Sequence, residues 1–304
     1  GGKNSGMKFY LVSDSSCDLG IEECRRRDID LVSFYVALGD DVYYREEREI
    51  STQAFYRKMA EMPGVFPRTS MPTIEDYLEA FRPHAERGMP VLCICLNGRF
   101  SGSVQSARNA RVVLLEDYPR AEIAVVDSQL ATVLQGLLVE EAADLRDRGC
   151  SLEEAVAALE PLPMTGRIFF TTNDLSYLQH GGRIGKAAAT TGTLLKVKPL
   201  IGYKDGELVS DGIAQGRARS LARVRELFFR HIDRGDLDLR DYRLATGFGL
   251  DREEYRDFAQ KVYEGLLERG YDRPEVNKPY QIGVTIGVHT GPTPLGVGLI
   301  RRAG

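Results

Sequence analysis

One stretch of this chain, residues 91–115, constrains its fold more than any other. Residues 91–96 are apolar and suit a buried strand, which an Asn-Gly pair ends. In the turn at residues 97–103, Ser101 and Ser103 supply capping hydroxyls directly before a run of helical character. A buried strand that leads through a polar turn into a helix predicts one unit of an α/β fold.

The turn at Ser101 is also a candidate binding site. A helix that begins here leaves backbone N–H groups unpaired, so the turn offers amides, hydroxyls and the positive end of a helix dipole to one small anion. These groups suit a carboxylate or a phosphate. An ordinary helix cap after a buried strand accounts for the same residues, so both interpretations stay open at this point.

Strands and helices alternate through the first half of the chain. Strands are expected at residues 8–13, 31–38, 91–96 and 121–126, and helices at residues 52–62, 73–81, 104–115 and 129–148. Thr73 and Asp76 have the spacing of a capping box. Gly136 inside a helix costs about 1 kcal/mol against Ala, which predicts close packing against a neighbour. A Pro-Leu-Pro sequence then breaks the chain, and we expect a parallel-sheet α/β domain over residues 7–162.

The second half, residues 163–304, predicts an α/β domain with a mixed sheet. A hairpin is expected around Lys204-Asp205-Gly206. Further strands are expected at residues 167–171, 242–247, 281–288 and 296–300, and helices at residues 174–179, 186–195, 217–231 and 252–269. A hairpin combined with βαβ units implies a mixed sheet. The expected fold class is therefore α/β with two domains.

Composition and charge argue against several classes of protein. The 304 residues are 43% hydrophobic and 28% charged, as in ordinary globular proteins, and a net charge of −4 offers nucleic acid no general attraction. No apolar run approaches the ~18 residues of a membrane-spanning helix and no signal peptide precedes Met7, so we expect a cytoplasmic protein. Its scattered Cys and His residues lack metal-ligand spacing, so no metal is expected.

Several polar residues lie in turns at the expected ends of strands, which is where open α/β sheets bind ligands. They are Asp14, Ser15, Thr69, Ser70, Ser101, Asp127, Ser128, Arg183 and His289. Taken singly, Ser, Thr and Asp cap helices everywhere, so each has a structural explanation beside the functional one. His289 ends an apolar run before Thr290-Gly291-Pro292, and it fits a core histidine as well as a ligand-facing one.

The order and spacing of these motifs form a pattern over residues 8–301. The motifs are Asp14-Ser15 with Asp18-Leu19, Thr69-Ser70-Met71-Pro72, residues 101–107, Asp127-Ser128, Tyr177-Leu178 with Gly181-Gly182-Arg183-Ile184, Lys198-Pro199 and His289-Thr290-Gly291-Pro292. Together they resemble the DegV family of bacterial fatty-acid-binding proteins, which includes the FakB subunits of fatty acid kinase. That resemblance implies a two-domain α/β fold with the ligand held between the domains.

The resemblance also implies a function and a binding site. The ligand would be a long-chain fatty acid, with no cofactor, no metal and no catalytic activity of the chain itself. Its carboxylate would be held by Thr69, Ser70, Ser101 and His289, with Thr290 beside them and Arg183 near the mouth. The acyl chain would fill an apolar tunnel. A separate fatty acid kinase subunit would be the partner, and it would phosphorylate the presented carboxylate to an acyl phosphate.

Two other classes of function are consistent with the same residues. Ser101 could act as a nucleophile with His289 as its base in an acyl-transfer or hydrolytic enzyme, although Ser101 lies in Arg-Phe-Ser-Gly-Ser and not in a nucleophile elbow. A nucleotide- or phosphate-binding regulator could use the same helix N-termini, but the sequence holds neither a G-x-G-x-x-G motif nor a P-loop.

Overall fold

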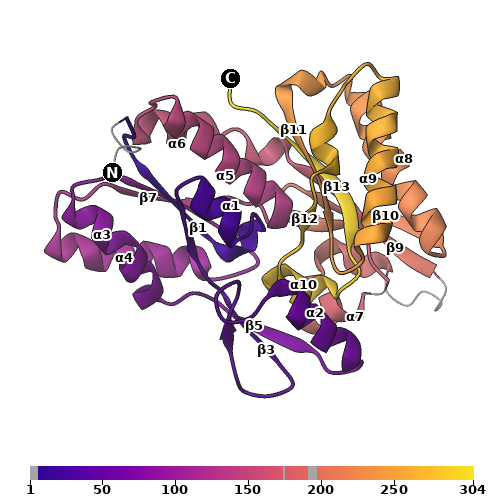
Figure 1. Ribbon diagram of the computed structural model, residues 1–304, viewed down its shortest axis with the longest axis horizontal. Helices are drawn as coiled ribbons and strands as arrows, with labels where there is room; N and C mark the ends of the chain where they lie inside the picture. Colours follow the sequence, from indigo (N-terminus) through magenta and orange to yellow (C-terminus); the bar gives the residue numbers. More distant parts are fainter. Residues whose placement is uncertain (1–5, 174, 191–196) are drawn as a thin grey trace.

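The computed structural model describes residues 6–173, 175–190 and 197–304. Each half of the chain builds one large sheet, and the two halves lie side by side (Figure 1). The sheet of the N-terminal half is parallel, with the strand order β2-β1-β6-β7. Its strands are β1 (Tyr10–Asp14), β2 (Ile29–Val32), β6 (Val91–Cys95) and β7 (Ile123–Asp127).

Helices cover both faces of the parallel sheet because its strands alternate apolar side chains between the two faces. Val12, Cys93 and Cys95 share one hydrophobic cluster with α3 (Ile74–Glu86) and α4 (Ser103–Asp117). The intervening Leu11, Leu92 and Ile94 belong to a second cluster on the opposite face. The helices of that face are α1 (Ile21–Arg26), α5 (Thr132–Asp147) and α6 (Leu152–Leu159).

The sheet of the C-terminal half is mixed, with the strand order β10-β9-β8-β13-β11-β12. Its neighbours are antiparallel except β11 and β12, which run parallel. The strands are β8 (Arg167–Thr171), β9 (Val197–Lys204), β10 (Glu207–Gln215), β11 (Tyr242–Phe248), β12 (Tyr280–Gln281) and β13 (Leu295–Arg301). The expected α/β fold, parallel in the first half and mixed in the second, is confirmed.

Helix α5 lies between the two sheets and joins their cores. The mixed sheet packs α8 (Arg217–Gly235) and α9 (Arg252–Glu268) on one face. Its other face turns toward α5, so Ile168, Phe170 and Tyr203 share one hydrophobic cluster with Leu134 and Leu138. Figure 1 shows α5 at the boundary between the two halves.

Gly136 explains how α5 approaches the first strand so closely. A Cβ atom on this residue would lie 2.4 Å from the carbonyl oxygen of Cys17 and 3.2 Å from the Leu19 side chain. The expectation that Gly136 packs against a neighbour is confirmed. The partner is the short 3-10 helix η1 (Ser15–Cys17) and the residues that follow it.

We expect Gly136→Ala to lower the free energy of unfolding by about 1–2 kcal/mol. Forcing a methyl against a backbone oxygen costs roughly 1–3 kcal/mol, which exceeds the ~1 kcal/mol that Ala adds to helix propensity. Urea unfolding of the variant and the parent measures the difference. Helix propensity alone predicts the opposite sign, so a more stable variant would contradict this account.

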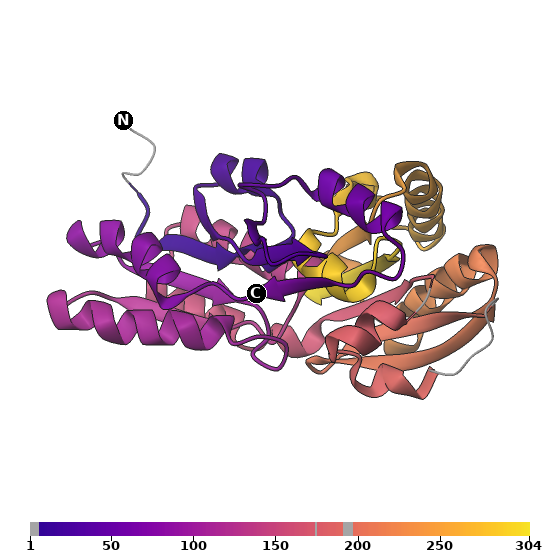
Figure 2. The ribbon, with the colours of Figure 1, turned by 90° about the horizontal axis from the view of Figure 1, so that it is seen from below.

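A small third sheet extends from the N-terminal half toward the C-terminal half. It is antiparallel, with the strand order β4-β3-β5, and consists of β3 (Tyr35–Leu38), β4 (Tyr44–Arg45) and β5 (Pro67–Ser70). Helix α2 (Thr52–Glu61) completes this segment. Figure 2 shows this segment lying over the yellow helix α10 (Val284–Thr290) of the C-terminal half, and contacts link α2, β3 and β5 to that helix.

The small sheet corrects two expectations. Residues 31–38 were expected to form one strand, but β2 ends at Val32 and β3 begins at Tyr35 in another sheet. The break is stabilised because the Phe34 N–H donates to the Ser15 hydroxyl at 2.9 Å. Thr69 and Ser70, expected in a turn, are the last residues of β5 and pair with β3.

The expected strand over residues 281–288 was wrong. Only Tyr280–Gln281 is a strand (β12), and Val284–Thr290 forms helix α10. Two contacts from the N-terminal half override the β-branched composition. The Glu46 carboxylate accepts the Thr285 N–H at 2.6 Å at the start of the helix, and Tyr56 packs where Gly287 has no side chain.

The remaining helical segments agree in part with expectation. Helix α7 spans Ser176–Gly181, while Asp174 of the expected helix lies outside the described residues. The segment expected at residues 186–195 is described only as a 3-10 helix, Gly185–Thr190, and residues 191–195 lie outside the description. Other 3-10 turns are Pro163–Thr165, Leu239–Asp241 and Pro274–Asn277.

Candidate functional site

A cavity of about 340 Å³ lies between the two halves of the chain. This volume falls in the range of about 300–1,000 Å³ that is typical of ligand pockets. The residues of the N-terminal half that line it are Phe34, Thr69, Ser70, Met71, Leu96, Phe100, Ser101, Gly102, Ala131, Thr132 and Val133. Those of the C-terminal half include Ile168, Phe170, Leu178, Arg183, Tyr203, Leu208, Ile282, Thr285, Ile286, His289, Thr290 and Leu295.

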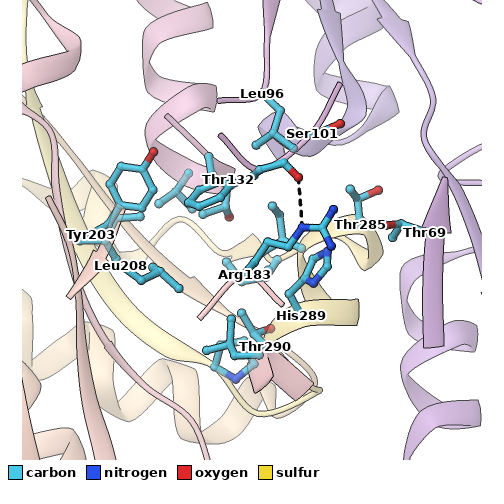
Figure 3. Close-up of a pocket in the computed structure, with 18 of the residues that line it drawn as sticks. Thr69, Leu96, Ser101, Thr132, Arg183, Tyr203, Leu208, Thr285, His289 and Thr290 are labelled. Atoms are coloured by element: carbon cyan, nitrogen blue, oxygen red, sulfur yellow. Dashed lines mark hydrogen bonds between the residues drawn. The ribbon is translucent and has the colours of Figure 1, made fainter. Parts of the chain in front are cut away.

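The structure brings all six predicted ligand-binding residues to this one cavity. They are Thr69, Ser70, Ser101, Arg183, His289 and Thr290. Figure 3 shows the Arg183 guanidinium beside His289, with Ser101, Thr69 and Thr285 at the same end of the cavity. Four separate segments of the sequence therefore converge on this cavity.

Ser101 sits in the turn between β6 and α4. Its hydroxyl oxygen accepts the Ser103 N–H at 3.1 Å, as expected for a residue that caps the helix start. Because the oxygen is occupied as an acceptor, the hydroxyl proton is the part that can be donated to an anion in the cavity.

Asp14 holds the Ser101 turn in place from behind and does not line the cavity. Its carboxylate is completely buried and accepts the Leu96 N–H at 2.8 Å and the Ser103 hydroxyl at 2.9 Å. Gln135 and Ser16 donate to its other oxygen. Burial raises the pKa of Asp14, and these four donors oppose the rise. Asp14 therefore positions the turn and leaves ligand contact to the residues in front of it.

Asp127, another of the polar candidates, is also structural. Its carboxylate accepts the backbone N–H groups of Gly98 and Gln129, and it does not line the cavity.

The end of β5 carries Thr69 and Ser70 to the same polar end. Thr69 is half-buried, whereas Ser70 is exposed. Met71 follows them and packs on the Ser101 turn so closely that a Cβ on Gly102 would lie 2.7 Å from its sulfur. The two hydroxyl-bearing segments are thus neighbours in space, although about thirty residues separate them in the sequence.

His289 lies in the last turn of α10, with its Nδ1 atom buried against Gly181. A Cβ on Gly181 would come within 2.4 Å of this nitrogen. Among the described residues, Nδ1 has no hydrogen-bond partner. Burial, together with the nearby Arg183 charge, lowers the pKa of His289 to about 4. The imidazole is therefore neutral at neutral pH, and Arg183 supplies the positive charge of the site.

We expect the His289 ring in the ligand-free protein to stay neutral between about pH 5 and pH 8, since its pKa lies near 4. NMR spectra of the histidine ring carbons, assigned with a His289→Gln variant, measure the titration directly. A bound carboxylate favours the protonated ring and is expected to move the midpoint upward. A ligand-free midpoint near 6.5 would contradict the buried environment described here.

Arg183 and Thr290 differ in how free their polar groups are. The Arg183 guanidinium donates to the carbonyl oxygens of Phe100 at 3.2 Å and Gly181 at 2.6 Å, so it links the two halves at the cavity mouth. The Phe100 contact is the dashed line in Figure 3. The Thr290 hydroxyl donates to the Gly291 carbonyl at 2.9 Å, so its proton is already engaged.

The rest of the cavity lining is mostly apolar. Many of these side chains belong to the shared core of the two halves: Phe34, Leu96, Ile168, Phe170, Leu178, Tyr203, Leu208 and Ile282. A cavity with one group of polar side chains and a larger apolar lining suits a ligand with a single anionic group and a hydrocarbon chain.

Sequence reasoning missed Thr132 and Thr285, which also line the cavity. Thr285 is four residues before His289 and so lies on the same face of a helix, but the segment was expected to be a strand. Recognising Gly283 as a helix start would have revealed the pair. Both threonines also donate to buried carboxylates, Thr132 to Asp18 at 2.5 Å and Thr285 to Glu46 at 2.8 Å.

The site gives limited support to nucleophilic catalysis. Within the described part of the chain, no hydrogen bond joins Ser101 to His289, and no carboxylate orients the imidazole. A histidine with a pKa near 4 is also a weak base at neutral pH. Across residues 6–173, 175–190 and 197–304, no cluster of three or more His, Cys, Asp or Glu side chains could hold a metal, and no helix is both long and apolar enough to span a membrane.

Comparison with known proteins gives a consistent result over the full length of the chain. The family model described as "Uncharacterised protein, DegV family" matches residues 8–302. A DegV domain-containing protein from Clostridium perfringens is 30% identical over 286 residues, which is 93% of this chain and 94% of that protein.

Solved structures with the same fold include proteins that are described as fatty-acid-binding. A stearic-acid-binding protein from Eubacterium ventriosum is 37% identical with a TM-score of 0.91, and the match covers 97% of this chain and 99% of that one. A fatty-acid-binding DegV family protein from Thermus thermophilus is 31% identical with a TM-score of 0.83, over 97% and 100% of the two chains. The fatty-acid-binding DegV protein of Bacillus subtilis is 26% identical, with a TM-score of 0.79 and the same coverage.

Proposed function

This chain belongs to the DegV family, and from that premise we propose that it binds a long-chain fatty acid in the cavity between its two halves. The observation that carries the proposal is the cavity itself. Thr69, Ser101 and His289 converge at its polar end, and an enclosed apolar lining continues away from them. The relatives described as fatty-acid-binding proteins support the same ligand class.

The polar end would orient the ligand. The hydroxyls of Thr69 and Ser101 donate to the carboxylate, and the nearby Arg183 guanidinium offsets its charge. Neutral His289 donates through its Nε2–H, and Ser70 and Thr290 complete the rim of this end. These contacts fix which end of the ligand faces the mouth.

The apolar lining would supply most of the affinity. At about 0.8 kcal/mol per buried methylene, roughly a dozen methylenes contribute about 10 kcal/mol before the ordering of the chain is subtracted. One hydrogen bond to the carboxylate contributes about 1.5–3 kcal/mol. The tail therefore decides how tightly the ligand binds, and the polar end decides how it is presented.

A carrier role is the finer part of the proposal. The chain would present the bound carboxylate to a fatty acid kinase subunit for conversion to an acyl phosphate, without catalytic activity of its own. The exposed Arg183 at the mouth supports this role because its charge lies where a phosphorylated product would emerge. Formation of acyl phosphate from ATP by such a kinase, only when the loaded protein is added, tests this step.

The binding proposal is tested by extraction and mass spectrometry of the lipid carried by the purified protein, followed by titration with hexadecanoic acid. We expect Ser101→Ala to weaken binding about tenfold, because one hydrogen bond to a charged acceptor is lost. Ser106→Ala is the matched control, since Ser106 lies in the first turn of α4, five residues after Ser101, but does not line the cavity.

Three outcomes would change the proposal. The absence of any bound acyl chain, together with no uptake of added fatty acid, would overturn it. Unchanged affinity in Ser101→Ala with weakened affinity in Thr69→Ala would move the centre of the site to the end of β5. Hydrolysis of an activated ester that disappears in Ser101→Ala would instead favour the enzymatic alternative with Ser101 and His289.

A further inference from the structure

We propose that Tyr203 sets the upper limit on the length of the acyl chain that the cavity accepts, an inference that rests on the proposed function. Tyr203 belongs to β9 of the mixed sheet, is 2% exposed and lines the cavity. Its role depends on where its ring lies and on how the ring is held.

The Tyr203 ring lies at the end of the cavity opposite the polar groups. Figure 3 shows Tyr203 and Leu208 on one side, and Ser101, Thr69 and Thr285 on the other. A fatty acid whose carboxylate is bound at Ser101 therefore directs its methyl end toward the Tyr203 ring. The ring of Phe100 meets Tyr203 edge-on at a centroid distance of 6.0 Å and completes this wall.

Two hydrogen bonds from the other half of the chain fix the Tyr203 hydroxyl. It donates to the Gln129 carbonyl oxygen at 2.6 Å and accepts an N–H of the Asn97 amide at 2.9 Å. Asn97 in turn donates to the Gly206 carbonyl at 2.7 Å, which holds the adjacent hairpin turn. We name Asn97, Gln129 and Tyr203 the end latch.

The end latch holds the Tyr203 ring in one position, whereas an aliphatic side chain in this wall would have no hydrogen bonds to hold it. Moving the ring aside would break both hydrogen bonds of the buried Tyr203 hydroxyl, while Asn97 keeps its contacts with Gly206 and Gln129. The penalty for an unpaired buried hydroxyl exceeds the gain from burying one further methylene. A chain that reaches the ring therefore stops there, whereas Leu208 beside it can change rotamer without losing a hydrogen bond.

The test distinguishes the effect of the Tyr203 ring on ligand length from the effect of its hydroxyl. The full-length parent, Tyr203→Ala and Tyr203→Phe are each incubated with an equimolar mixture of saturated even-chain acids from dodecanoic to docosanoic acid, and the bound acids are quantified by mass spectrometry. We expect the preferred ligand of Tyr203→Ala to be about two to four carbons longer than that of the parent protein, because truncation leaves roughly the volume of the ring as a cavity. Tyr203→Phe keeps the ring but removes the two hydrogen bonds that hold it, so we expect a smaller shift in the same direction, with lower thermal stability.

Each outcome is decisive. A longer preferred ligand in Tyr203→Ala, with a smaller shift in Tyr203→Phe, supports the inference, and bound fatty acids with an unchanged length distribution in Tyr203→Ala overturn it. A parent protein that takes up none of the acids overturns the proposed function together with the inference. Should Tyr203→Ala fail to fold, Tyr203→Leu removes the ring and the hydroxyl but keeps an apolar side chain, and a longer preferred ligand is then required of it.

Discussion

Octanoic acid is expected to bind about a thousandfold more weakly than hexadecanoic acid. The longer acid buries eight more methylenes, which contribute roughly 6 kcal/mol at about 0.8 kcal/mol each. The conformational entropy lost when these bonds are ordered offsets about a third of that gain. The remaining ~4 kcal/mol corresponds to about three orders of magnitude in Kd. Isothermal titration or displacement of a fluorescent fatty acid measures the two constants.

The same pair of acids measured on Ser101→Ala provides the control. Removing the hydroxyl weakens both acids by a similar factor, so the ratio of their dissociation constants should stay near that of the parent protein. Equal affinity for the two acids in the parent would mean that the apolar lining contributes little. In that case the cavity would be a site for a small anion and the proposed ligand class would be wrong.

Asp18→Asn is expected to raise the free energy of unfolding at about pH 8, and to change it little at about pH 4.5. Asp18 and Glu46 are buried carboxylates that meet where Gly283 has no side chain, since a Cβ there would lie 2.4 Å from Asp18 Oδ1 and 3.0 Å from Glu46 Oε2. In the described part of the chain, Asp18 Oδ1 has no hydrogen-bond partner. An amide at this position can donate to Glu46.

The direction of this effect is set by the pKa values of the pair. Burial and the neighbouring Glu46 raise the pKa of Asp18, and burial raises that of Glu46 to about 7. For Glu46, stability is fully present below the unfolded pKa near 4.5, and it is lost as the pH rises toward 7. The loss is about 3 kcal/mol, at about 1.4 kcal/mol per unit. The raised pKa of Asp18 causes a loss of stability of the same sign as the pH rises, and Asn at position 18 removes that loss.

Urea unfolding of the parent and of Asp18→Asn at several pH values measures the effect, which we expect to reach about 2 kcal/mol at alkaline pH. Titratable groups far from position 18 contribute equally in both proteins, so their contributions cancel in the difference. Asp14→Asn is the matched control. Its carboxylate accepts four hydrogen bonds, which an amide cannot do, so this variant should be less stable throughout. A similar loss of stability in Asp18→Asn would refute the explanation that the buried carboxylates of Asp18 and Glu46 destabilise the protein at alkaline pH.

Much of the fold could be predicted because it depends on local chemistry. The capping box of Thr73 and Asp76 forms as expected, and so does the hairpin turn, in which Asp205 and Gly206 both adopt positive φ. Apolar strands that alternate with helices gave the parallel sheet, and a hairpin within the same alternation gave the mixed one. The family pattern of motifs added the residues of the polar end.

The errors fall where contacts between distant residues outweigh local preference. Residues 284–290 carry β-branched side chains, yet Glu46 and Tyr56 from the other half hold them as α10. This error hid Thr285 from the predicted site. Residues 31–38 were divided between two sheets for a similar reason, since the Ser15 hydroxyl holds the backbone between them.

The sequence by itself determined the α/β class, the order of the elements and the residue types able to bind a carboxylate, because each depends on neighbours along the chain. Only the tertiary structure decided that Thr69, Ser101 and His289 share one cavity, that Asp14 supports the turn from behind, and that Tyr203 closes the far end. Such arrangements depend on packing and hydrogen bonds between residues about thirty to two hundred positions apart, and no local pattern encodes those distances.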